Sequence, residues 1–164
     1  MIKIREVKAK DRGNIYELLQ IDDKFKPGEV NEILHRIDLY LFDADQQLYK
    51  VILAEDKLKA LLGYAVYGRD PKADATYQIY NLTHSPLVDN GEVILQLLLF
   101  IENELLKNKG RIIVSELSSS FKYRNYVEIF LKQNYNLSSV VNSFYAEGED
   151  KLILSKYINT SSNN

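Results

Sequence analysis

The stretch that decides the fold is Ser85-Pro86-Leu87-Val88-Asp89-Asn90-Gly91-Glu92-Val93-Ile94-Leu95-Gln96-Leu97-Leu98, which connects an expected strand to a long apolar helix. At such a junction, backbone N–H groups and the positive end of the helix dipole bind a phosphate, provided that small residues let it approach. Here Asp89 and Glu92 bring two carboxylates to the junction. The stretch therefore predicts a strand–loop–helix unit whose loop is poorly suited to phosphate.

Strand and helix patterns alternate on both sides of this stretch. Alternating or short apolar runs predict strands at residues 2–8, 49–55, 61–68, 77–84, 111–117, 140–145 and 151–157. Helical periodicity predicts helices after Asp11, after Asn31, over 93–107 and over 122–133. Pro27-Gly28 is expected to interrupt the helical pattern between the first two. Gly110 and Asn134 are expected in the left-handed conformation that ends a helix. This order predicts a mixed α/β (α+β) fold.

Composition excludes several classes of function. The chain has 164 residues and a net charge of −2, so general nucleic-acid binding is not expected. It has no cysteine and only two histidines, far apart, which argues against a metal site. No apolar run is long enough to span a membrane, and the first residues lack the apolar core of a signal peptide. We therefore expect a cytoplasmic protein with no membrane partner.

The C-terminal half carries the clearest motifs. Val114-Ser115-Glu116-Leu117-Ser118-Ser119 is followed by Tyr123, Ile129-Phe130 and Asn134-Tyr135, and later by Tyr145-Ala146-Glu147-Gly148-Glu149-Asp150-Lys151. In this order and spacing, these motifs resemble the GNAT superfamily of acyl-CoA-dependent N-acyltransferases. The resemblance implies one GNAT-like domain over residues 1–158, and the polar residues 159–164 that follow are expected to form a disordered tail. It also implies a mixed, mostly antiparallel, twisted sheet of about seven strands with about four helices.

The same resemblance implies an activity and a cosubstrate. GNAT enzymes transfer an acetyl or other acyl group from acetyl-CoA or another acyl-CoA to a primary amine, here of a small molecule or peptide. Backbone groups of Leu82 and Thr83 would pair with the pantetheine arm of CoA. The pyrophosphate loop of the family falls on Asp89, Asn90, Gly91, Glu92, Val93 and Ile94.

That loop departs from the family pattern at three positions. Asp89 replaces a polar donor, Glu92 replaces a glycine, and Ile94 replaces a second small residue. A carboxylate about 5 Å from a phosphate, at an effective dielectric constant of about 20, opposes binding by roughly 3 kcal/mol before screening. We therefore expect CoA binding to be weakened or lost. In a chain that no longer binds CoA, both acids would simply stabilise the helix dipole; the alternative is that this site takes a different ligand, cationic or uncharged.

Each candidate catalytic residue has a catalytic and a structural interpretation. Phe130 stands where many GNAT enzymes have a tyrosine that protonates the departing thiolate, and phenylalanine has no proton to give. Glu116 is the candidate general base, or else an ion-pair partner at a strand end. Tyr145 would shape the acceptor pocket, or else pack over a hairpin turn. Two functions stay open: an N-acetyltransferase, and a non-catalytic pseudoenzyme that serves as a binding or homodimerisation module.

Overall fold

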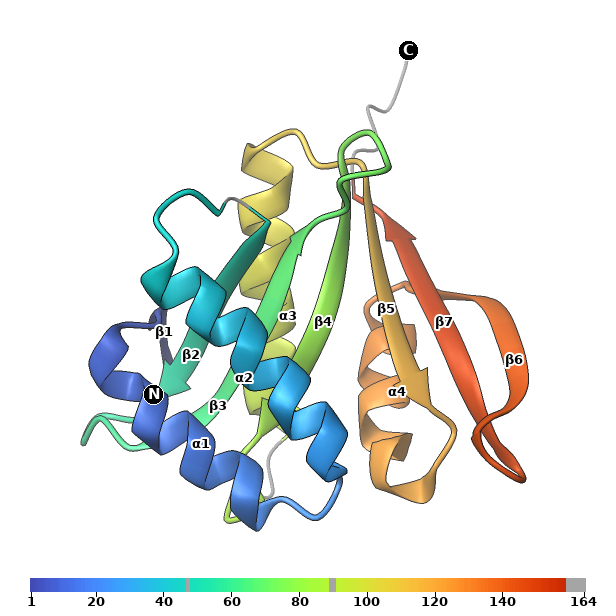
Figure 1. Cartoon of the computed structure of the whole chain (residues 1–164). Coiled ribbons are helices and arrows are strands. Elements are labelled where there is room, and N and C mark those ends of the chain that lie inside the picture. The colour runs from blue at the N-terminus through green and yellow to red at the C-terminus, as the bar shows by residue number, and fades with distance from the viewer. Residues whose placement is uncertain (47, 89–90, 159–164) are drawn as a thin grey trace. The chain divides into compact units, whose positions relative to one another are not determined.

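The computed structural model describes residues 1–46, 48–88 and 91–158 (Figure 1). The expected tail at 159–164 lies outside the described residues. The elements in chain order are β1 (Lys3–Glu6), the 3-10 helix η1 (Ala9–Asp11), α1 (Arg12–Ile21), α2 (Pro27–Phe42), β2 (Tyr49–Glu55), β3 (Leu61–Arg69), β4 (Thr76–His84), α3 (Gly91–Lys107), β5 (Ile112–Ser118), the 3-10 helix η2 (Phe121–Tyr123), α4 (Arg124–Lys132), β6 (Asn136–Ala146) and β7 (Glu149–Tyr157).

The strands form one sheet in the order β1-β2-β3-β4-β5-β7-β6. The pairs β1–β2, β2–β3, β5–β7 and β6–β7 are antiparallel, whereas β4 and β5 run parallel over Thr76–Ile79 and Ile112–Ser115. In the described part of the chain this is a mixed, mostly antiparallel sheet of seven strands with four α-helices. The predicted fold class is confirmed. Among these residues, no helix is both long and apolar enough to cross a membrane.

The chain divides into two compact units. The first contains Met1–Gly68 and Tyr80–Phe100, and the second contains Arg69–Ile79 and the residues from Ile101 onward. In the first unit, α1 and α2 cover one face of β2 and β3 (Figure 1), where Ile15, Leu19, Ile37, Val51 and Tyr64 belong to the core. In the second unit, α4 buries Tyr126 and Phe130. The unit boundary crosses β4 and α3, so both elements contribute to each unit.

The start of α2 corrects the sequence prediction. Asn31 was expected to cap this helix, but the helix begins at Pro27, and Asn31 lies inside it. Proline is well suited to the first helical position because its fixed φ fits the helix and its missing N–H has no intrahelical partner there. Glu29 completes the helix start by accepting a hydrogen bond from the Lys26 backbone N–H at 2.8 Å. The Pro27-Gly28 pair therefore starts the helix and does not break it.

The end of α3 gives a second correction. Lys109, with φ of 57°, takes the left-handed conformation that was expected of Gly110. Glycine is needed at position 110 for space, since a Cβ there would lie 2.9 Å from the Leu105 carbonyl oxygen. The expectation for Asn134 is confirmed by its φ of 64° after α4.

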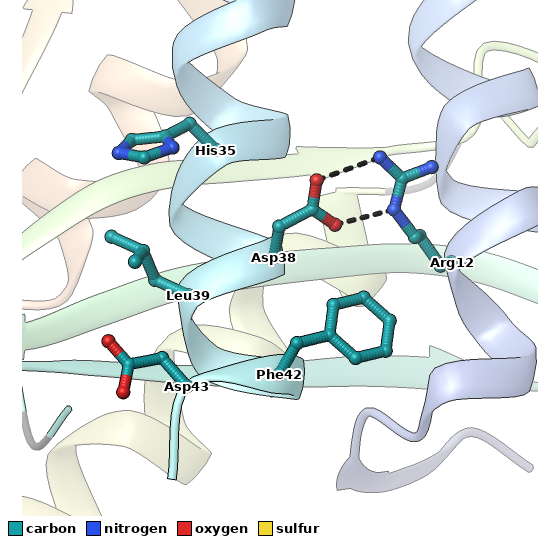
Figure 2. A pocket seen from close by; sticks show the side chains of 6 residues that line it. All are labelled: Arg12, His35, Asp38, Leu39, Phe42 and Asp43. Carbon is teal, nitrogen blue, oxygen red and sulfur yellow. Dashed lines mark hydrogen bonds and ion pairs between the residues drawn. The ribbon is translucent and has the colours of Figure 1, made fainter. Parts of the chain in front are cut away.

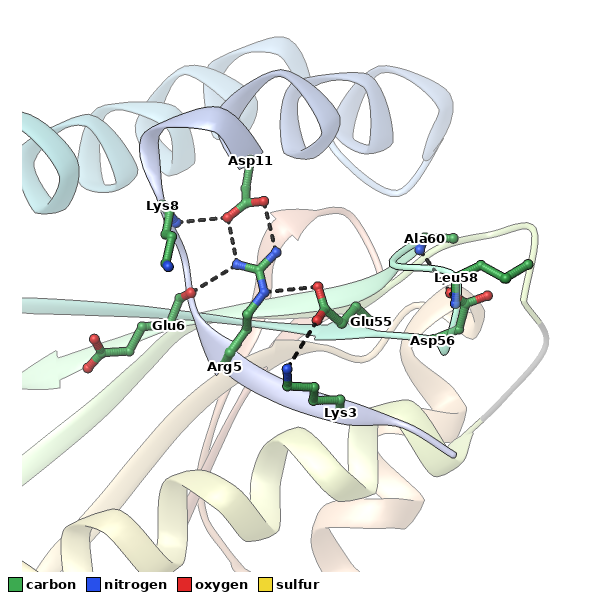
Figure 3. Close-up of polar contacts among 9 residues, drawn as sticks. All are labelled: Lys3, Arg5, Glu6, Lys8, Asp11, Glu55, Asp56, Leu58 and Ala60. Atoms are coloured by element: carbon green, nitrogen blue, oxygen red, sulfur yellow. Dashed lines mark hydrogen bonds and ion pairs between the residues drawn. The ribbon is translucent and has the colours of Figure 1, made fainter.

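An arginine cluster fixes β1 against its neighbours (Figure 3). Arg5 donates to both carboxylate oxygens of Asp11 at 2.7 and 2.9 Å, and its Nε donates to Glu55 at 2.9 Å. The Lys8 backbone N–H also donates to Asp11 at 2.8 Å. The hydrogen bonds from Arg5 hold the pKa of the Asp11 carboxyl below its usual range, against an opposing effect of burial. Both carboxylates are buried, and the guanidinium supplies the charge that they require.

Candidate functional site

The end of β4 carries the two residues that were expected to face an acyl-CoA arm. Leu82 and Thr83 are both buried. The Thr83 carbonyl oxygen lies only 2.5 Å from where a Cβ of Gly63 would be, and the Val93 side chain lies 2.9 Å from the same position. The Ser85 backbone N–H donates to the Leu62 carbonyl at 2.7 Å. Gly63 on β3 is thus required for the close approach of β4.

The Thr83 side chain meets a buried ion pair from the loop after α1. Thr83 Oγ1 lies 3.4 Å from Asp22 Oδ2, although the two residues are 61 positions apart in the chain. Asp22 Oδ2 is also 2.7 Å from the Lys24 Nζ. Sequence reasoning missed both residues, because an Asp and a Lys in an interhelix loop carry no signal of burial. Only the fold brings them to β4.

The α3 N-terminus separates the predicted loop residues into two groups. Asp89 and Asn90 lie outside the described residues, and Gly91 is the first residue of the helix. Glu92 is exposed and accepts a hydrogen bond from the Gln96 side chain at 2.7 Å, one turn along the helix. Val93 and Ile94 are buried among core residues. An acid in the first turn of an exposed helix face stabilises the helix dipole.

In the second unit, Glu116 and Tyr145 belong to one side-chain cluster. Glu116 on β5 forms an ion pair with Lys151 on β7, with 2.7 Å between Oε2 and Nζ. Lys151 Nζ also lies 3.9 Å from the centre of the Phe144 ring, a cation–π contact. Phe144 in turn meets Tyr145 edge to face at 5.0 Å between ring centres. The candidate base is therefore held by an ammonium group.

The acids of the predicted terminal motif also have partners inside the chain. Glu149 accepts a hydrogen bond from Ser118 Oγ at 2.5 Å. Asp150 Oδ1 accepts one from the Ser143 backbone N–H at 2.8 Å, which closes the β6–β7 hairpin. These contacts agree with the interpretation of the motif as a hairpin turn.

Phe130 is completely buried on α4 and meets Tyr135 edge to face at 4.7 Å between ring centres. Burial raises the pKa of the Tyr135 hydroxyl well above its usual range, and the neighbouring Glu102 carboxylate raises it further. Glu102 itself is paired with Lys156 at 2.7 Å. The buried hydroxyl of Tyr135 is therefore a weaker acid than that of an ordinary tyrosine.

A surface pocket of about 570 Å³ opens on α1 and α2 (Figure 2). Arg12, His35, Asp38, Leu39, Phe42 and Asp43 line it. The two charged side chains at its centre already bind each other, because Arg12 donates to both oxygens of Asp38 at 2.5 and 2.8 Å. These hydrogen bonds lower the pKa of Asp38. The pocket contains none of the residues that the sequence nominated. Across the described residues, no three His, Cys, Asp or Glu side chains are grouped to hold a metal ion.

Comparisons with known proteins identify similar solved structures. No family model matches the sequence, and no curated protein matches it either. A Desulfovibrio desulfuricans protein assigned to the GNAT family of acetyltransferases has a TM-score of 0.87 at 22% identity, over 97% of this chain and 100% of the other. The ribosomal-protein-S18-alanine N-acetyltransferase of Escherichia coli has a TM-score of 0.80 at 15% identity, over 100% and 98%. A Salmonella typhimurium protein assigned as an acetyltransferase, solved with its cofactor acetyl-CoA, has a TM-score of 0.74 at 12% identity, over 99% and 96%.

Proposed function

Because the chain has the fold of the GNAT N-acetyltransferases, we propose that it is an N-acyltransferase that moves an acyl group from acyl-CoA to a primary amine of a small molecule or peptide. The observation that carries the proposal is the likeness to such structures along the whole chain. Fold alone does not fix chemistry, so the site residues supply the rest of the argument.

The proposed reaction is a direct transfer. The amine nitrogen attacks the thioester carbonyl carbon, the C–S bond breaks, and the thiolate of CoA takes up the proton that the amine loses. Backbone groups of Leu82 and Thr83 would hold the acyl-CoA arm and polarise its carbonyl. Phe130 has no hydroxyl to relay that proton, so water or another group has to carry it from the amine to the thiolate.

We further propose that this protein binds acyl-CoA weakly, because Glu92 places a carboxylate in the first turn of α3. Glu92→Gln removes one negative charge with little change of shape. We expect it to tighten CoA binding about tenfold, since about 1.4 kcal/mol of electrostatic repulsion corresponds to that factor. Glu128→Gln on α4, another exposed helix acid, is the matched control and is expected to leave the Kd unchanged. A Kd that is the same for Glu92→Gln and the unmodified chain contradicts this part of the proposal.

A non-catalytic binding module is the second candidate function. The observation that favours it is the Glu116–Lys151 ion pair, with 2.7 Å between charged atoms. A carboxylate that is held by an ammonium group is not oriented to accept a proton from an incoming amine. Together with Phe130, which has no proton to give, this ion pair speaks against proton transfer by either the candidate base or the position of the usual acid.

One experiment separates the two functions. Calorimetry with CoA and acetyl-CoA up to millimolar concentration measures binding, and release of the CoA thiol in the presence of a panel of primary amines measures transfer. Binding together with amine-dependent thiol release supports the enzyme. Absence of both at millimolar acetyl-CoA overturns the enzyme in favour of the binding module.

The homodimer also remains a prediction. β6 is the last strand of the sheet, and Leu137, Val140, Val141 and Phe144 on it are exposed. None of its residues from Asn136 to Ala146 is charged, and charged residues are what usually keep an edge strand from pairing with another chain. Sedimentation velocity over a range of concentrations measures the association directly, and a monomer at every concentration contradicts it.

A further inference from the structure

The loop after α1 buries an ion pair between residues only two positions apart. Asp22 caps the C-terminus of α1, and its side chain is 2% exposed. Its Oδ1 accepts a hydrogen bond from the Lys24 backbone N–H at 3.1 Å, and its Oδ2 lies 2.7 Å from the Lys24 Nζ. The Lys24 side chain is 9% exposed, which is unusual for lysine.

The turn itself does not require the buried ammonium group. α2 ends in the same way, at Asp43, whose Oδ1 accepts a hydrogen bond from the Asp45 backbone N–H at 3.0 Å. There the residue two positions on is an acid, and both side chains are exposed. The turn geometry is thus satisfied by the backbone hydrogen bond alone. The burial of the Lys24 ammonium against Asp22 is an additional feature of the first loop.

The ion pair lies against the strand end that the resemblance assigns to acyl-CoA. Thr83 Oγ1 lies 3.4 Å from Asp22 Oδ2, and Thr83 is completely buried. A carboxylate in such surroundings requires a cation. An alkylammonium group can supply the charge and three N–H donors. The Lys24 side chain is thus a primary ammonium group on a four-carbon chain, and it is bound in a buried site at the end of β4.

We propose that Asp22 and Thr83 form a subsite for a primary ammonium group, which the Lys24 side chain occupies in the free protein. The ammonium group of a linear alkylamine substrate displaces that of Lys24 and takes its place beside Asp22. Its nitrogen can accept an acyl group only after the ammonium has lost a proton, to the Asp22 carboxylate or to water, and the assignment of this amine to the acyl acceptor rests on the proposed function. Ammonium binding at Asp22 does not depend on it.

Chemical rescue without any acyl-CoA tests the subsite. Lys24→Ala removes the resident ammonium group, and we expect a lower melting temperature. n-Propylammonium, which reproduces the three carbons and the ammonium group that the substitution removes, is expected to restore at least half of that loss, saturably, at millimolar concentration. Tetramethylammonium, which has no N–H donor, is expected to restore none. Absence of a saturable response to n-propylammonium overturns the proposal.

Two variants control for nonspecific effects of the amine. Asp22→Asn combined with Lys24→Ala removes the carboxylate as well, and is expected to show no rescue. Lys107→Ala removes the ammonium group of an exposed pair, because Lys107 lies 3.1 Å from Glu104 and its side chain is 73% exposed, and it is expected to show no rescue. Equal rescue of either variant overturns the proposal. If Lys24→Ala does not fold, Lys24→Met keeps the apolar stem, lacks only the ammonium group, and is tested with the ammonium ion in the same way, with the same outcomes.

Acyl transfer is measured separately, so that the two proposals can fail independently. In an active enzyme, Asp22→Asn is expected to raise the KM for a linear alkylamine at least tenfold with a smaller change in kcat. Rescue of Lys24→Ala without any transfer by the unmodified chain would support the subsite and contradict the proposed function. Transfer with an unchanged KM in Asp22→Asn would support the proposed function and contradict the assignment of the acyl acceptor to this subsite.

Discussion

Gly63 is the residue on which the geometry at the end of β4 depends most directly. A Cβ there would lie 2.5 Å from the Thr83 carbonyl oxygen and 2.9 Å from Val93 Cγ1. Backbone atoms cannot move aside as easily as the end of a flexible side chain. We expect Gly63→Ala to lower the free energy of unfolding by about 1–3 kcal/mol through overpacking, measured by urea denaturation.

Gly28→Ala is the matched control for that substitution. Gly28 lies in the first turn of α2, and a Cβ there meets nothing within 4 Å. Alanine is favoured over glycine in a helix by up to about 1 kcal/mol, so this variant is expected to be as stable as the unmodified chain or more so. A Gly63→Ala variant as stable as Gly28→Ala would mean that β3 and β4 do not approach so closely.

Phe130 occupies a core position, and its burial predicts the effect of restoring a tyrosine there. The ring is completely buried and packs on Tyr135. A tyrosine hydroxyl placed there without a partner costs about 1–3 kcal/mol. We therefore expect Phe130→Tyr to lower the free energy of unfolding by that amount and to leave acyl transfer no faster. Phe121→Tyr, at a side chain that is 80% exposed, is the control and should change stability by less than about 0.5 kcal/mol. Faster transfer in Phe130→Tyr would show that the hydroxyl reaches the reacting thiolate.

Among the elements, β1 is short and depends on the Arg5 cluster (Figure 3). Asp11→Asn removes the carboxylate that accepts two hydrogen bonds from Arg5. We expect a loss of roughly 1.5–3 kcal/mol in the free energy of unfolding at pH 7, the usual magnitude for hydrogen bonds to a charged group. Because the pKa of Asp11 is lowered in the folded chain, its stabilisation is fully present above the unfolded pKa of about 4. It is lost as the pH falls through the lower folded value.

Urea denaturation at pH 7 and below pH 4 therefore measures this contribution. The difference between Asp11→Asn and the unmodified chain should shrink as the solution becomes acidic. Asp74→Asn, at a side chain that is 89% exposed, should stay close to the unmodified chain at both pH values. A difference for Asp11→Asn that is equally large at both would mean that the carboxylate does not act through its charge.

The elements also show what the sequence could and could not predict. Alternation and helical periodicity predicted every strand and α-helix in the right order, because these patterns are local. The start of α2 was missed because Pro27 can either end one helix or begin another. β6 begins earlier than expected, at Asn136, since its exposed residues leave no alternating pattern to detect.

The candidate site could be predicted only in part, for the same physical reason. The assignment of Leu82 and Thr83 to the acyl-CoA arm comes from the resemblance and stays a prediction. The contact between Asp22 and Thr83, and the one between Glu116 and Lys151, join residues far apart in the chain. Such contacts depend on which strands and loops become neighbours in the fold, and no local pattern of residues predicts those neighbours.

At the scale of the whole molecule, the two units share two continuous elements. The unit boundary crosses β4 after Ile79 and α3 after Phe100. A helix and a strand each unfold cooperatively along their length, so neither unit can lose its part of α3 without disturbing the other. We expect the chain to unfold in one transition, as small proteins of this size commonly do.

Leu19→Ala tests this coupling from one unit to the other. Leu19 is buried in the core of the first unit, and its truncation is expected to cost about 2–5 kcal/mol. If unfolding is cooperative, hydrogen exchange of the slowest amides in β5 and β7, in the second unit, should accelerate by the factor that corresponds to the same free energy. Leu58→Ala, at a side chain that is 88% exposed, should leave those amides unchanged. Accelerated exchange confined to α1, α2 and β1–β3 would instead show that the two units unfold independently.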